Sequence, residues 1–80
     1  MKITKAIRKE ISPFLPLQYR IIVVERLQAR GIKVHPNTVS NVYKHGNENA
    51  VVANELIALA AEYKRMEMQS IKTMRQLSAA

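Results

Sequence analysis

The chain contains no cysteine and no aspartate among its 80 residues. Without cysteine, neither a disulfide nor a thiolate metal site can stabilise the fold. The two histidines, His35 and His45, are ten positions apart, so no metal site is expected. A Gly-rich phosphate loop is also missing, and Ser40 and His45 do not define a catalytic dyad by sequence spacing alone. These absences predict a protein that is not an enzyme, with no catalytic residues, no cofactor and no small-molecule ligand.

Long hydrophobic runs are absent as well. No apolar stretch approaches the ~20 residues that a helix needs to cross a bilayer. The N-terminal sequence MKITKAIRKEI carries charges throughout and lacks the apolar core of a signal peptide. We therefore expect a cytoplasmic protein without a membrane partner. With 48% hydrophobic residues, the chain has enough apolar side chains for one small globular domain.

Acidic side chains are scarce relative to basic ones. Six Glu stand against 13 Lys and Arg, which gives a net charge of +7 and a sequence pI near 10.2. Residues 1–45 carry nine of the basic residues and two of the Glu, so the first half of the chain holds the excess. An excess of this size is typical of nucleic-acid-binding proteins. Many small basic proteins also bind polyanions without specificity, and charge alone does not separate the two.

Glycine and proline are few, and they divide the chain into helical segments. Isoleucines four residues apart favour a helix over residues 3–11, with a strand or a flexible arm as alternatives. The basic side chains of residues 2–9 either follow phosphates or only keep the surface soluble. Ser12 and Pro13 end the segment, because the residue before a proline is pushed out of helical geometry.

Residues 17–30 are predicted to form a second helix, because apolar side chains recur at helical spacing. Its apolar stripe comprises Ile21, Val24 and Leu27. Gly31 is well placed to adopt the left-handed conformation just past the end of this helix. Pro36 then begins a third helix, since a proline at the first helical position loses no hydrogen bond.

The third helix spans residues 36–45 and ends at Gly46. Val39 and Val42 fall on one buried stripe, and Val34 supports the helix from just before its start. Most of the side chains between these valines can form hydrogen bonds. His35 occupies the N-cap position, where a neutral imidazole can accept a backbone N–H. The pattern predicts a helix that is fixed on one side and polar on the others.

Two helices joined by a glycine-containing turn, the second polar on its outside, are the parts of a helix-turn-helix. A helix of this kind fits the major groove of DNA, where amides and hydroxyls read base edges. The sequence NTVSNVYKHG resembles the recognition helix of lac-repressor-type headpieces of the lambda-repressor-like fold, whose Thr-Val-Ser-x-Val signature stands here at residues 38–42. Residues 22–46 carry the resemblance, and the short chain is also similar to phage Cro and repressor proteins. The family usually has a shorter turn and a Ser or Thr cap.

The resemblance implies a repressor-like regulator of phage or bacterial type that binds double-stranded DNA at specific sequences. It implies that Asn37, Ser40 and Asn41 face the major groove and that Thr38 holds a phosphate. Asn37 and Asn41 are four residues apart, so they share one face, and either could grip adenine bidentately. The other candidates for contacts to the DNA backbone are basic side chains, namely Arg20, Lys33, Lys44 and His45.

Residues from Asn47 or Asn49 to about Leu77 contain neither proline nor glycine and favour one long helix. At 1.5 Å per residue, ~28 residues span roughly 42 Å, more than so small a body can cover. The distal half therefore needs a partner, a bend or frayed ends. The predicted fold is all-α, a compact helix-turn-helix bundle of about four helices with a long C-terminal helix. Residues 1–64 are the DNA-binding domain, and residues 65–80 are a helical extension.

Apolar side chains on this extension suggest a homodimer contact, with the candidates Tyr63, Met66, Ile71, Met74 and Leu77. Dimeric helix-turn-helix proteins place two recognition helices about one turn of DNA apart, which predicts a palindromic site. The alternative is a protein–protein interaction module. Its Met-rich C-terminal helix would be the active surface, and its nucleic-acid affinity would be non-specific.

Overall fold

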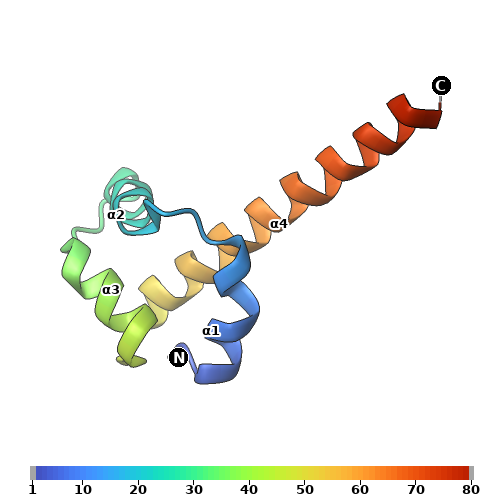
Figure 1. The fold of residues 1–80 in the computed structure, drawn as a ribbon. Helices are drawn as coiled ribbons and strands as arrows, with labels where there is room; N and C mark the ends of the chain where they lie inside the picture. The colour runs from blue at the N-terminus through green and yellow to red at the C-terminus, as the bar shows by residue number, and fades with distance from the viewer. Residues whose placement is uncertain (1, 80) are drawn as a thin grey trace.

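The computed structural model describes residues 2–79, which form four α-helices and a short 3-10 helix, with no β-strand in this range (Figure 1). The elements in chain order are α1 (Lys5–Ile11), η1 (Ser12–Phe14), α2 (Tyr19–Ala29), α3 (Pro36–His45) and α4 (Ala50–Ala79). The predicted all-α fold with a long C-terminal helix is confirmed. Figure 1 shows α1, α2 and α3 gathered around the first half of α4, whose second half projects away from them.

The helix ends lie at residues whose local chemistry favours them. Gly31 and Gly46 have φ angles of +80° and +67°, the left-handed geometry predicted past α2 and α3. Of the two asparagines at which the predicted long helix could begin, Asn49 is the N-cap of α4, because its Oδ1 accepts the Val52 N–H at 3.1 Å. Thr4 caps α1 in the same way. Turn and cap chemistry in the sequence therefore sets one boundary of each of the four α-helices.

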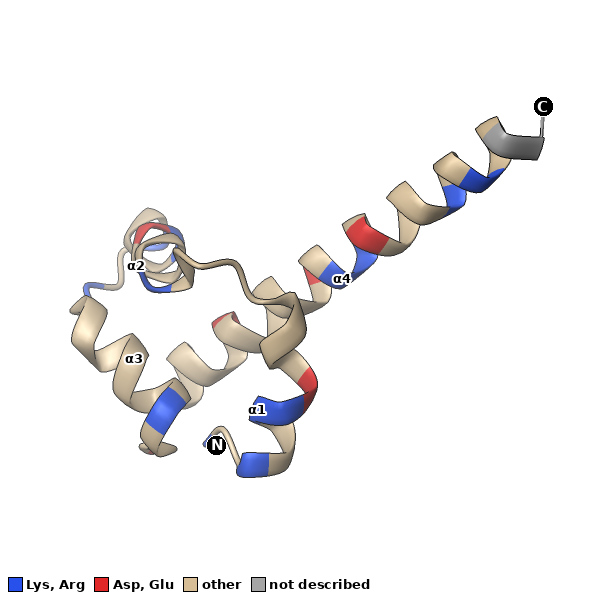
Figure 2. Ribbon diagram, in the orientation of Figure 1, with Lys and Arg blue, Asp and Glu red and all other residues tan. Residues whose placement is uncertain are grey.

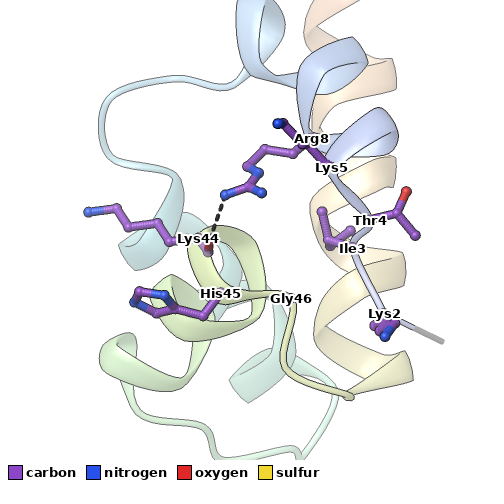
Figure 3. Close-up of a pocket in the computed structure, with 8 residues that line it drawn as sticks. All are labelled: Lys2, Ile3, Thr4, Lys5, Arg8, Lys44, His45 and Gly46. Carbon is purple, nitrogen blue, oxygen red and sulfur yellow. Dashed lines mark hydrogen bonds between the residues drawn. The ribbon is translucent and has the colours of Figure 1, made fainter.

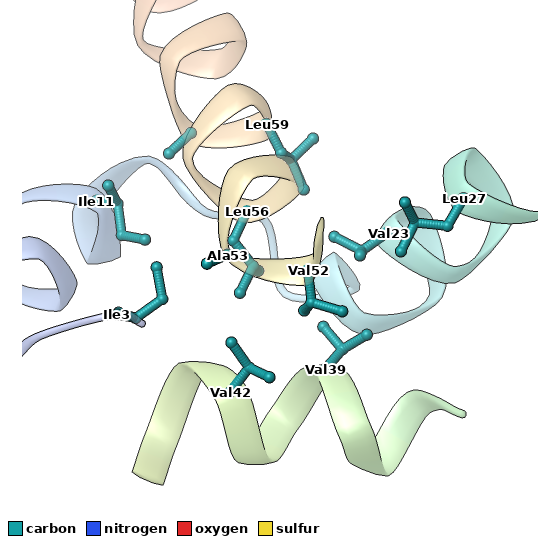
Figure 4. Close-up of a cluster of buried hydrophobic side chains, with 11 residues drawn as sticks. Ile3, Ile11, Val23, Leu27, Val39, Val42, Val52, Ala53, Leu56 and Leu59 are labelled. Carbon is teal, nitrogen blue, oxygen red and sulfur yellow. The ribbon is translucent and has the colours of Figure 1, made fainter. Parts of the chain in front are cut away.

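A single apolar core joins all four α-helices (Figure 4). Its buried members are Ile3, Ile11, Val23, Leu27, Val39, Val42, Val52, Ala53, Leu56, Leu59 and Ala60. Figure 4 shows Val39 and Val42 pointing from α3 toward α4. Full burial of a side chain of this size stabilises the fold by about 1.5–3 kcal/mol relative to exposure. The two valines therefore fix which side of α3 faces outward.

α2 buries only part of the apolar stripe that its spacing predicts. Leu27 of that stripe is completely buried and Val24 is half-buried. Ile21 is 52% exposed, and Val23, which lies outside the stripe, is completely buried instead. The prediction for Ile21 was wrong because residues 21–24 are all β-branched and offer an apolar side chain in every direction. Packing against α3 and α4, rather than spacing within α2, selects the buried side.

The distal half of α4 extends beyond the core without a bend. The helix runs unbroken through the predicted domain boundary after residue 64, and residues 64–77 are exposed. Met66 is 48% and Leu77 is 73% exposed. Residues 1 and 80, the outer ends of the two predicted parts, lie outside the described residues. Across residues 2–79 no helix is both long and apolar enough to cross a membrane.

Candidate nucleic-acid interface

α3 lies on the surface with its valine side against the core. Val39 and Val42 are fully buried, and Val34 is half-buried in the connection just before α3. At the far end of α3, the ring of Tyr43 packs against that of Tyr19 in the first turn of α2, with centroids 5.1 Å apart. α3 is therefore held at both ends, which limits its freedom to rotate about its axis.

The opposite side of α3 presents two amides and an ammonium group. At about 100° per residue, Asn37, Asn41 and Lys44 lie roughly opposite Val39. All three are exposed. Ser40 lies nearer to the Tyr43 side and is half-buried, so it is less accessible than the two asparagines. The structure thus places Asn37 and Asn41 together at the centre of the outer side of α3.

His35 caps α3 with its side chain. Its backbone is extended (φ −82°, ψ 145°), and its Nδ1 accepts the Asn37 N–H at 3.1 Å. This geometry assigns the neutral tautomer that carries its proton on Nε2. The imidazole thereby takes the place of the Ser or Thr usual in the family that the sequence resembles, and it satisfies one of the unpaired N–H groups of the first turn.

Removal of this cap is expected to destabilise the fold. We expect His35→Ala to lower the free energy of unfolding by about 1 kcal/mol, because the Asn37 N–H loses its acceptor. For a domain of this size the melting temperature should fall by about 4–8 °C. His35→Asn, which keeps an acceptor at the N-cap, should melt close to the wild type. Thermal unfolding followed by circular dichroism measures both, and an alanine variant with unchanged melting would show that the cap contributes nothing.

The predicted DNA-backbone residues occupy three separate places around α3. Arg20 lies in the first turn of α2, Lys33 in the connection before α3, and Lys44 and His45 in the last turn of α3; all four are exposed. Thr38 is half-buried in the first turn of α3. Figure 2 shows Lys and Arg on α1 and at the C-terminal end of α3. Positive charge therefore borders α3 at its ends.

Arg26 of α2 and Arg30, just past its end, are engaged within the protein instead. Arg26 Nη2 lies 2.8 Å from Glu62 Oε2, and Arg30 Nη1 lies 2.9 Å from Glu55 Oε2. Both carboxylates belong to α4, so these ion pairs tie α2 to α4. Near α3, the basic residues that remain for an outside partner lie on α1, at the end of α3 and in the connection between α2 and α3. The distal half of α4 carries a separate set, namely Lys64, Arg65, Lys72 and Arg75 (Figure 2).

Sequence reasoning did not connect α1 with α3, and the structure does. Lys44 and His45 line one surface hollow together with residues from the start of the chain, among them Lys2, Lys5 and Arg8 (Figure 3). Arg8 Nη1 donates a hydrogen bond to the Lys44 carbonyl oxygen in the last turn of α3. The basic content of residues 2–9 was the signal in the sequence, but nothing in a local pattern indicates which helix end it reaches.

The connection between α2 and α3 covers residues 30–35, longer than the turn usual in lac-repressor-type proteins. No family model matches the chain, and comparison with curated proteins and with solved structures finds no similar protein. The resemblance of residues 22–46 to a recognition helix therefore stays a prediction, and the outer side of α3 is the feature from which a function can be argued.

Proposed function

We propose that the protein binds double-stranded DNA at specific sequences, with α3 in the major groove, as a repressor-like transcriptional regulator in the cytoplasm. The observation that carries the proposal is the outer side of α3, where Asn37 and Asn41 are exposed on a helix whose other side is buried. The major groove admits an α-helix, and a bidentate asparagine is a common partner of adenine N6 and N7. Ser40, half-buried beside them, contacts a base at the edge of the groove.

The basic residues around α3 supply contacts to phosphates in this proposal. Lys33 lies just before the start of α3, and Lys44 and His45 lie at its end. Arg20 extends this set from the first turn of α2, and Thr38 adds a hydroxyl. Contacts of this kind fix the orientation of a protein on the duplex without reading sequence. The net charge of +7 favours association with such a polyanion.

The proposed binding unit is a homodimer formed through the distal half of α4. Within one unbroken helix, Met66, Met74 and Leu77 lie on the same side as the core residues Leu56 and Leu59. Tyr63 is the last residue of that side to be partly buried against the core. Ile71 lies at the edge of the same side. A second copy carries the same side, which is apolar apart from Glu67 and Ser70, so the two can form a symmetric pair. The pair would bring two α3 helices to a palindromic site.

The second candidate function is a protein–protein interaction module, and one observation favours it. Met66, Met68 and Met74 are all exposed on the distal half of α4. Methionine adapts to partners of varied shape and is frequent on promiscuous binding surfaces. Such a module would bind its partner through α4 and would use its basic half only for non-specific nucleic-acid affinity.

Selection from a randomised duplex library tests the proposed function directly. We expect the full chain to enrich a palindromic motif at low salt and to retain it at high salt, because base contacts do not depend on counterion release. The measurement is the sequence of the bound duplexes at both salt concentrations. Enrichment that disappears with salt and leaves no motif would instead assign the basic half to non-specific binding and favour the interaction module.

A further inference from the structure

A basic groove lies between α1 and the C-terminal end of α3, beside the outer side of α3. It consists of two adjoining hollows that share Lys5 and Arg8. The first hollow also contains Lys2, Lys44 and His45 (Figure 3). The second is lined by Lys5, Arg8, Lys9, Ser12, Pro13 and Tyr43. We refer to the two together as the α1–α3 groove.

The lining of the α1–α3 groove carries charge of one sign. Five of its residues are Lys or Arg, and none is acidic. Glu10, the acidic residue of α1, lines a different hollow together with Ile57 and Lys64 of α4. α1 therefore presents its basic side to the groove and its carboxylate to α4. Outside this lining, Glu48 interacts with Lys2. A groove lined by basic side chains is complementary to a polyanion.

The groove is held in a fixed relation to α3. The hydrogen bond from Arg8 to the Lys44 carbonyl joins α1 to the last turn of α3. Ile3, just before α1, is 2% exposed, and its carbonyl oxygen lies so close to Gly46 that a Cβ added there would be 3.1 Å away. Lys5 and Lys9 therefore project from a helix that is joined to the end of the proposed recognition helix by a hydrogen bond and by the close approach of Ile3 to Gly46.

We propose that the α1–α3 groove binds the sugar-phosphate backbone of duplex DNA next to the bases that α3 reads. This inference rests on the proposed function and extends it to a surface that the resemblance does not include. Lys5, Arg8 and Lys9 lie at i, i+3 and i+4, so one side of α1 carries all three. Lys44 lines the same groove from α3, so a DNA strand bound there would also lie beside the outer side of α3.

The test compares two double variants of equal charge change. Lys5→Gln/Lys9→Gln removes two charges from the groove, and Lys72→Gln/Arg75→Gln removes two from the exposed distal half of α4. Binding of each full chain to a random-sequence duplex is measured by fluorescence anisotropy between 50 and 200 mM salt. Each lost phosphate contact lowers the slope of log K against log salt by about 0.9. We expect the groove variant to lose about 1.8 in slope and to bind roughly 60-fold more weakly at 0.1 M salt. The α4 variant should match the wild type.

The outcomes separate the groove from the proposed function. Equal slopes for the two variants, with circular dichroism confirming that both are folded, would overturn the inference. The ratio of affinities of the wild type for the selected and the random duplex tests base reading independently. If the slope is reduced in the groove variant but the wild type shows no sequence preference, the groove contacts phosphates without specificity. That result would contradict base recognition by α3. If the wild type prefers the selected duplex and the groove variant keeps the wild-type slope, only the proposed role of the groove is contradicted.

Discussion

Alanine at both Asn37 and Asn41 is expected to remove most of the sequence discrimination of the protein while leaving its fold intact. A bidentate contact to a base contributes about 1–3 kcal/mol of discrimination, so loss of two should cost at least about 2 kcal/mol, roughly 30-fold. Both side chains are exposed, and alanine favours a helix more than asparagine does, so α3 should persist. The measurement is the ratio of Kd values for the selected duplex and a scrambled one.

A matched control is available on the same protein. Asn47 and Asn54 are also exposed, but they lie outside α3, so Asn47→Ala/Asn54→Ala should keep the wild-type ratio. Non-specific affinity should be unchanged in both double variants, because no charge is altered. Discrimination that survives in the variant at positions 37 and 41 would contradict the reading role of α3 and support the interaction module.

Glutamates on the exposed apolar stripe of α4 (Met66, Ile71, Met74 and Leu77) are expected to convert the proposed dimer to a monomer. In Met66→Glu/Met74→Glu, two charges per chain enter an apolar contact, where an unpaired charge costs several kcal/mol. The palindromic duplex should then be bound about 10²- to 10⁴-fold more weakly, because the two sites no longer act together. Affinity for a single half-site should change little. Sedimentation gives the oligomeric state, and anisotropy on one and two half-sites gives the affinities.

The control for this variant uses the other side of the same helix. Met68 and Gln76 lie away from the stripe at about 100° per residue, and both are exposed. Met68→Glu/Gln76→Glu changes the charge equally and should remain a dimer. A wild-type chain that sediments as a monomer at high micromolar concentration would contradict the homodimer and leave the apolar side of α4 to a different protein.

Local chemistry made α3 predictable from the sequence. Pro36 at the first helical position and Gly46 in the left-handed conformation restrict the backbone by themselves, so both ends are confirmed. Val39 and Val42 are the apolar residues at helical spacing in the middle of a polar segment, so only one buried side was available. His35 as the cap also follows from its position, since an acceptor is needed there and its Nδ1 provides one.

Other features depend on contacts between distant parts of the chain. Ile21 and Val23 are equally apolar, and only the packing of α2 against its neighbours decides that Val23 is buried. Arg8 and Lys44 are 36 residues apart, so the α1–α3 groove has no signature in either segment. The length of α4 beyond Tyr63 left a partner, a bend or frayed ends as alternatives, and the sequence did not decide among them. The structure excludes a bend within residues 2–79.

α4 runs as one helix from Asn49, beside the end of α3, to the exposed stripe. In the proposed dimer, the distance and the rotation between that stripe and each recognition helix are therefore set by a residue count. Each residue inserted after Tyr63 would move the stripe by 1.5 Å and turn it by about 100° relative to α3. The length of α4 would then determine the spacing of the two half-sites in the operator.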